Sequence, residues 1–250
     1  MPGSDEAIQK WDRWMRYLAH YHQCELVGGE NVPKTGGVVF AGTHSLASYD
    51  LFIVSHASSL LYGRRVLIVG DDLLLKLPRV GPFLREIGFI SGKREVVLER
   101  LADGEMIGIA PGGMMESLRS SRHKYEFDWS RRKGFAWVAL KAGAPVLPAV
   151  CPQADHIYTV VDNPLTPWLY KQFKVPLPFF AGRNFTPLPR PVKLIHLVGK
   201  PLYPDVAPDQ VTDADVDRFH AKIIDAVRAL MEEGRKMGDR AVGPDVRQIA

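Results

Sequence analysis

His44 and Asp50 are the residues of this sequence whose types and spacing could carry proton transfer. They lie in the stretch AGTHSLASYD, directly after the apolar run GGVVF. An imidazole titrates near neutrality and can remove a proton from a hydroxyl group, and a carboxylate on its other ring nitrogen fixes the tautomer. A hydrogen-bonded structural histidine is the alternative, and it is commoner for a single histidine. A catalytic role therefore needs support from other residues.

Three later segments contain further candidate residues, of which the cations and the glycines could bind anions or stabilise developing charge. They are IGFISGKREVV with Lys93 and Arg94, GIAPGGMMESL with Gly112, Gly113 and Glu116, and GAPVLPAV with Pro145 and Pro148. A glycine pair after a strand can present backbone N–H groups to an oxyanion without steric hindrance. Each segment alone is a common structural feature. Their order along the chain is what favours a shared function.

The order and spacing of these segments resemble the four sequence blocks of the glycerolipid acyltransferase superfamily. The resemblance covers about residues 36 to 150 and is closest in style to the diacylglycerol acyltransferase branch, because the third block reads Pro-Gly-Gly-x-x-Glu. One departure is that five residues, rather than the family's four, separate His44 from Asp50. On an ideal helix one extra residue turns a side chain by about 100°. A loop or bulge must absorb this turn if Asp50 is to reach His44.

This resemblance implies an O-acyltransferase that moves an acyl group from acyl-CoA to a hydroxyl of a lipid acceptor, such as a lysophospholipid or a mono- or diacylglycerol. The implied roles are general base for His44, its partner for Asp50, oxyanion donors for Gly112 and Gly113, and substrate binding for Glu116, Arg94 and Lys93. We expect no covalent enzyme intermediate, no metal and no cofactor, with acyl-CoA or acyl carrier protein as donor. Arg94 and Lys93 are expected at phosphates of coenzyme A or of a phospholipid.

Two other functions compete with this hypothesis. The first is a non-catalytic lipid-binding relative that kept the fold while its histidine–acid spacing changed. The second, an α/β hydrolase or thioesterase, is disfavoured because the chain has no Gly-x-Ser-x-Gly motif. The sequence leaves open the acceptor, the acyl chain length and the oligomeric state.

The elements that must position these residues alternate between strand and helix patterns. Short apolar runs predict strands within residues 36–42, 64–70, 105–111, 144–150 and 191–199. Helical patterns cover residues 46–62, 94–103 and 131–143, and a last one starts after the cap Thr212 and ends before Gly234. The alternation predicts an α/β fold with a mostly parallel central sheet flanked by helices. His44 then lies at the carboxyl end of a strand, where open α/β sheets bind ligands.

Two segments have the composition of a membrane-binding surface. Residues 1–23 predict an amphipathic helix with one apolar face, formed by Trp11, Trp14, Met15, Leu18 and Tyr21. An ordinary helix packed on the domain fits that pattern equally well. Residues 163–191 contain basic and aromatic side chains but no Asp or Glu, which favours an anionic membrane surface. Without a nucleic-acid-binding motif, we expect no nucleic-acid partner.

The composition fits one globular domain. The chain has 250 residues, 46% of them hydrophobic, and a formal net charge of +4. We expect an acyltransferase domain over residues 1–237 and a flexible tail over 238–250. Cys24 and Cys151 lack zinc-site spacing and are expected to be buried thiols. The N-terminus lacks the apolar core of a signal peptide, so we expect a cytoplasmic protein bound peripherally to the membrane.

Overall fold

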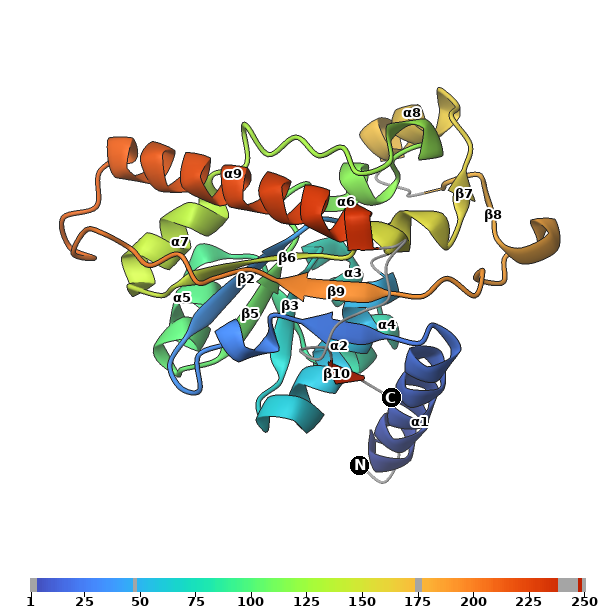
Figure 1. Ribbon diagram of the computed structural model, residues 1–250, viewed down its shortest axis with the longest axis horizontal. Coiled ribbons are helices and arrows are strands. Elements are labelled where there is room, and N and C mark those ends of the chain that lie inside the picture. Colours follow the sequence, from blue (N-terminus) through green and yellow to red (C-terminus); the bar gives the residue numbers. More distant parts are fainter. Residues whose placement is uncertain (1–3, 47–48, 174–176, 238–246, 249–250) are drawn as a thin grey trace.

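A computed structural model describes residues 4–46, 49–173, 177–237 and 247–248 (Figure 1). Its central sheet has eight strands in the order β10-β1-β9-β6-β2-β5-β3-β4. They are β1 (Glu25–Val27), β2 (Val38–Gly42), β3 (Val66–Gly70), β4 (Phe89–Ser91), β5 (Met106–Ile109), β6 (Val146–Val150), β9 (Ile195–Val198) and β10 (Arg247–Gln248). A separate pair is formed by β7 (Thr159–Val160) and β8 (Phe180–Ala181).

The sheet is mostly parallel, as predicted. Strands β6, β2, β5, β3 and β4 run in one direction, whereas β9 pairs antiparallel with β6 and parallel with β1. Strands β2 and β6 are buried along almost their whole length, which is why they read as continuous apolar runs rather than alternating ones. The carboxyl ends of the five parallel strands therefore share one edge of the sheet.

Helices cover both faces of this sheet. They are α1 (Ser4–Tyr21), α2 (Tyr49–Tyr62), α3 (Asp72–Lys76), α4 (Val80–Glu86), α5 (Arg94–Ala102), α6 (Gly113–Ser117), α7 (Gly134–Ala142), α8 (Leu165–Phe173) and α9 (Asp213–Met237). Helices α5, α7 and α9 pack on one face and α1 and α2 on the other, which gives two buried apolar clusters (Figure 1). Short 3₁₀ turns lie at Gly29–Asn31, Ser121–His123, Pro152–His156 and Arg183–Phe185.

The predicted helix ends are confirmed at two places and wrong at one. Gly143 adopts a left-handed conformation with φ of 62° and ends α7. At the start of α9 the Thr212 Oγ1 accepts the N–H of Asp215, whose carboxylate accepts the N–H of Thr212. Helix α9, however, continues through Gly234, where a Cβ would lie 2.9 Å from Pro152. This glycine allows close packing rather than a helix end.

The apolar face of helix α1 packs mainly against the interior of the protein. Met15 and Leu18 are buried, and Trp11 packs edge-on against Phe52 with ring centroids 5.6 Å apart. Of the two alternatives for this face, packing on the domain therefore accounts for Trp11, Met15 and Leu18. Trp14 is 54% exposed.

The predicted flexible tail over residues 238–250 is wrong at Arg247–Gln248, which form β10 on the edge of the sheet beside β1. The remainder of that tail, residues 238–246 and 249–250, lies outside the described residues. Over the part of the chain that the structure describes, none of the helices combines the length and apolarity needed to cross a bilayer.

Candidate active site

The predicted catalytic histidine lies at the carboxyl edge of the parallel strands. Strand β2 ends at Gly42, two residues before His44, and the Gly112–Gly113 turn follows the adjacent strand β5. On the other side of β2, Cys151 directly follows β6. The fold thus brings residues that are far apart in sequence to the place where open α/β sheets bind ligands.

Two side chains hold the backbone of His44. Its N–H donates to Oε1 of Glu116 at 2.5 Å, and its carbonyl accepts from Nη2 of Arg119 at 3.5 Å. The same Arg119 nitrogen donates to both carboxylate oxygens of Asp155, at 2.7 and 2.9 Å. Both contacts are made to the main chain. They therefore position the backbone of His44 and do not depend on its imidazole ring.

Glu116, predicted to bind substrate, contacts the main chain of His44 and also lines a polar hollow beside it. It is buried, and its second oxygen accepts the indole N–H of Trp129 at 2.8 Å. A Cβ on Gly112 would lie 1.8 Å from that oxygen, so the carboxylate occupies the space that the glycine leaves. Burial raises the pKa of Glu116, and the hydrogen bonds from His44 and Trp129 oppose that rise. Glu116 is a positioning residue for the His44 loop.

Arg119 and Asp155 are residues of this site that sequence reasoning missed. Both side chains are 13% exposed, and Asp155 also accepts the N–H of Tyr125 at 2.7 Å. Arg119 follows Glu116 by three residues, a spacing that could have placed both on one helical face. Asp155 gives no such signal, because it comes from the 3₁₀ turn Pro152–His156 after β6.

Asp50 lies in the same cavity as His44, and its carboxylate accepts the hydroxyl of Ser45. Because His44 precedes α2, which begins at Tyr49, ideal helical spacing does not govern how the two side chains meet. Asp50 is almost fully buried. Burial raises its pKa to about 6, and the Ser45 hydrogen bond lowers it in part. A direct bond from Asp50 to His44 remains a prediction.

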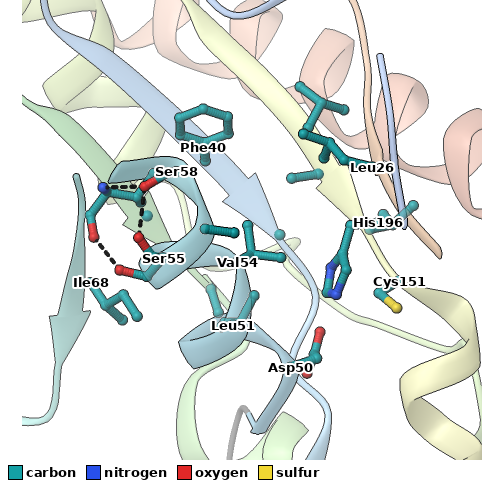
Figure 2. A pocket seen from close by; sticks show the side chains of 18 of the residues that line it. Leu26, Phe40, Asp50, Leu51, Val54, Ser55, Ser58, Ile68, Cys151 and His196 are labelled. Carbon is teal, nitrogen blue, oxygen red and sulfur yellow. Dashed lines mark hydrogen bonds between the residues drawn. The ribbon is translucent and has the colours of Figure 1, made fainter. Parts of the chain in front are cut away.

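Asp50 also faces a buried cysteine and histidine (Figure 2). Ligand atoms of Asp50, Cys151 and His196 lie within 4.8 Å of one another, and Nε2 of His196 has no hydrogen-bond partner within the described residues. A carboxylate, a thiolate and an imidazole are a donor set that could hold Zn²⁺. No zinc-site spacing is recognisable along the sequence, because these residues come from three separate elements. Cys24 and Cys151 are buried free thiols, as predicted.

An apolar cavity of about 90 Å³ opens beside His44 and Asp50. Figure 2 shows its wall of aliphatic and aromatic side chains, among them Phe40, Leu51 and Val54. Two of its hydroxyl groups are paired within the protein: Ser55 donates to the Val66 carbonyl at 2.6 Å and Ser58 to the Ser55 carbonyl at 2.7 Å. The cavity is therefore suited to an apolar ligand.

The other predicted site residues are only partly brought together. The N–H of Gly113 donates to the Ala110 carbonyl at 3.1 Å, which favours Gly112 of the two glycines as the oxyanion donor; that role remains a prediction. Arg94 stacks over the Trp137 ring at 4.5 Å and lines a separate cleft. Lys93 faces a further cleft beside Asp72. Neither cation lines the cavity that holds His44.

A family model described as diacylglycerol acyltransferase matches residues 4–245. The chain belongs to the diacylglycerol acyltransferase family. This chain is 29% identical over 226 residues to a Bos taurus protein named "DGAT1/2-independent enzyme synthesizing storage lipids", covering 90% of this chain and 64% of that protein. The Homo sapiens protein of the same name is 28% identical, with 90% and 65% covered. The chain thus spans slightly less than two thirds of the length of these relatives.

A solved structure supports the fold of this family member. The 1-acyl-sn-glycerophosphate acyltransferase PlsC from Thermotoga maritima matches 94% of this chain and 81% of its own, with a TM-score of 0.58 and 16% identity. The resemblance to the glycerolipid acyltransferase superfamily and the mostly parallel α/β sheet are therefore both confirmed.

Proposed function

We propose that this protein transfers an acyl group from acyl-CoA to a hydroxyl of a lipid acceptor, such as a lysophospholipid or a mono- or diacylglycerol. One observation carries the proposal: His44 lines both the apolar cavity and a second, polar hollow formed with Arg119 and Asp155. His44 thus lies between an apolar space and a small polar one, where a lipid hydroxyl next to an apolar chain could meet it. The names of the relatives, which refer to storage lipids, favour an acylglycerol acceptor.

The chemistry needs only groups of this chain. Neutral His44 takes the proton from the acceptor hydroxyl as its oxygen attacks the thioester carbonyl. The negative charge on the carbonyl oxygen is stabilised by the Gly112 N–H. Collapse of this intermediate breaks the carbon–sulfur bond, and the departing thiolate takes the proton from the imidazolium. No acyl group is attached to the enzyme at any step.

The cavity constrains how the acyl chain binds. Its volume of about 90 Å³ is below the ~150 Å³ of a cavity that admits benzene. Only the first carbons of a long chain fit unless neighbouring side chains move. We therefore expect the preferred acyl length to depend on apolar residues that line the cavity, such as Leu26 and Leu61.

An acceptor panel tests the function. Purified protein would be incubated with acyl-CoA labelled in its acyl chain and, separately, lysophospholipids, monoacylglycerol, diacylglycerol and fatty alcohols. We expect a labelled ester with at least one acylglycerol or lysophospholipid. Binding of lipid without any ester product would instead favour the non-catalytic lipid-binding relative.

Acyl transfer is expected to persist well below pH 6.5. Burial, and secondarily the positive charge of Arg119, lower the pKa of His44 to about 4, so the imidazole stays neutral down to about that pH. The ionisation of His44 should lower kcat/KM only as the pH approaches 4, whereas that of an ordinary histidine would lower it near 6.5. Because the pKa of Asp50 is raised to about 6, the pH–rate profile is measured for Asp50→Asn as well, and an acid limb near 6.5 that persists in this variant would contradict the prediction.

The lowered pKa of His44 also makes the folded protein less stable in acid. The unfolded chain binds a proton at His44 near pH 6.5, before the folded chain does. The contribution of this group to the free energy of unfolding is therefore complete above pH 6.5 and is lost as the pH falls towards 4.

Peripheral membrane binding belongs to the same proposal. Exposed apolar side chains concentrate in residues 161–188: Val161, Leu165, Trp168, Leu177, Phe179, Phe180, Phe185 and Leu188. The Tyr21 hydroxyl at the end of α1 donates to the Pro189 carbonyl at 2.8 Å, which joins this segment to the helix that carries exposed Trp14. Helix α1 and residues 161–188 both lie towards the right of Figure 1. We call residues 161–188 the aromatic segment.

Replacing Phe179 and Phe185 with serine is expected to weaken binding to anionic liposomes by roughly tenfold for each phenylalanine, because each ring would lose its burial in lipid. Phe185 is 96% exposed, so its replacement should not disturb the fold. Co-sedimentation measures the change. Tyr203→Ser, at an exposed position outside the aromatic segment, is the matched control. Equal sedimentation of all variants would argue against this surface.

A further inference from the structure

A basic cleft lies at the carboxyl edge of the sheet, separate from the apolar cavity beside His44. The cleft has a volume of about 460 Å³ and is lined by four cationic side chains: Arg94, Arg131, Arg132 and Lys133. Among the described residues that line it there is no aspartate or glutamate. Such a cleft concentrates anionic ligands.

The cations differ in how far their charge is already compensated. Lys133 forms an ion pair with Asp217 at 2.6 Å, and Arg94 stacks on Trp137. Arg131 and Arg132 are exposed, and neither has an ion pair within the part of the chain that the structure describes. A guanidinium can bind phosphate oxygens through two parallel hydrogen bonds. These two arginines are therefore the best candidates for contacts with a phosphate.

Helix α7 contributes a second favourable element. It begins at Gly134, on the wall of the cleft, and has no acidic residue in its first turn and no side-chain cap at Lys133. Its first N–H groups and the positive end of the helix dipole thus add to the arginine charges.

The position of the cleft identifies the kind of anion. Val69, Ile109 and Ala110 line both the basic cleft and the apolar cavity that contains His44. The two spaces therefore share a wall, which ends at the Gly112 turn. An acyl-CoA has the matching division: an apolar chain at one end, phosphates at the other, and the thioester between them.

Resting on the proposed function, we infer that the cleft formed by Arg94, Arg131, Arg132 and Lys133 binds the nucleotide phosphates of the acyl-CoA donor. The acyl chain then enters the apolar cavity, and the thioester lies at the shared wall near His44 and Gly112. This assignment favours coenzyme A over acyl carrier protein as the carrier of the acyl group.

The test compares donors that share an acyl group but differ in their phosphates. Rates would be measured with acyl-CoA, acyl-pantetheine and acyl carrier protein, using the full chain and the double variant Arg131→Gln/Arg132→Gln. We expect the KM for acyl-CoA to rise about ten- to a hundredfold with kcat nearly unchanged, since uniform binding is lost. The KM for acyl-pantetheine, which lacks phosphates, should stay the same. Arg100→Gln, at the far end of α5 from Arg94 and paired with Asp103 at 4.0 Å, is the matched control.

Calorimetric titration with coenzyme A itself separates this inference from the proposed function, because it needs no turnover. Wild type and Arg100→Gln should bind coenzyme A, and the double variant should bind it at least tenfold more weakly, with affinity falling as salt rises. Equal binding by all three proteins would overturn the inference even if acyl transfer is observed. A KM effect confined to acyl carrier protein, or equal for acyl-CoA and acyl-pantetheine, would also overturn it.

Discussion

Replacing His44 with alanine is expected to lower kcat for acyl transfer by about 10²–10⁴-fold. The variant loses the imidazole that removes the hydroxyl proton. It keeps the two contacts that hold this loop, since Glu116 binds the main-chain N–H of residue 44 and Arg119 its carbonyl. The loss should therefore be in turnover rather than in folding. Initial rates and thermal unfolding of the same preparation measure both.

His123→Ala is the matched control for this experiment. Its side chain is 57% exposed and pairs with Glu126 at 2.9 Å, and it does not line the cavity beside His44. This variant should turn over like the wild type. If His44→Ala retained wild-type kcat, another group would have to act as the base.

Replacing Gly112 with alanine is expected to cause the second largest effect. The new methyl group would lie 1.8 Å from Oε2 of Glu116 and 2.6 Å from its Cβ, so the entire Glu116 side chain must leave its place. The N–H groups of His44 and Trp129 then lose their acceptor, at roughly 1–3 kcal/mol of the free energy of unfolding for each donor left buried. Displacing the base by about 1 Å can cost about 10²-fold in rate. Urea unfolding and initial rates measure the two losses.

The neighbouring Gly113→Ala separates this packing effect from backbone strain. No atom lies within 4 Å of a Cβ at Gly113, but its φ is +62°. Left-handed strain should cost about 1–2 kcal/mol while Glu116 keeps both bonds, so activity should fall less than in Gly112→Ala. If Gly112→Ala equalled the wild type in stability and rate, Glu116 would not be needed to position His44.

The main features of the fold could be predicted because the long parallel strands are buried on both faces. The runs around Val39, Ile107 and Leu147 are continuous and apolar, and they made the strand–helix alternation recognisable in the sequence. Strands β1, β4 and β10 were not predicted, because segments of two or three residues have too few side chains to show a periodicity. They form through pairing with neighbours already in the sheet, which is a tertiary effect.

The site was predictable only in part for a similar reason. The histidine and the Gly-Gly turn follow recognisable strands, so their meeting at one edge could be expected. Asp155, Cys151 and His196 reach the site through segments with no local signal of function. Glu116 was identified as important, but its burial against Gly112 and Trp129, which decides its role, depends on packing that a sequence does not display.

The most direct test follows both products of acyl transfer at once. Purified protein would be supplied with acyl-CoA labelled in the acyl chain and with the best acceptor, and released coenzyme A and lipid-bound label would be measured over time. We predict equal amounts of both, with no label on the protein. Release of coenzyme A without ester, or label retained on Cys151, would contradict direct transfer promoted by His44.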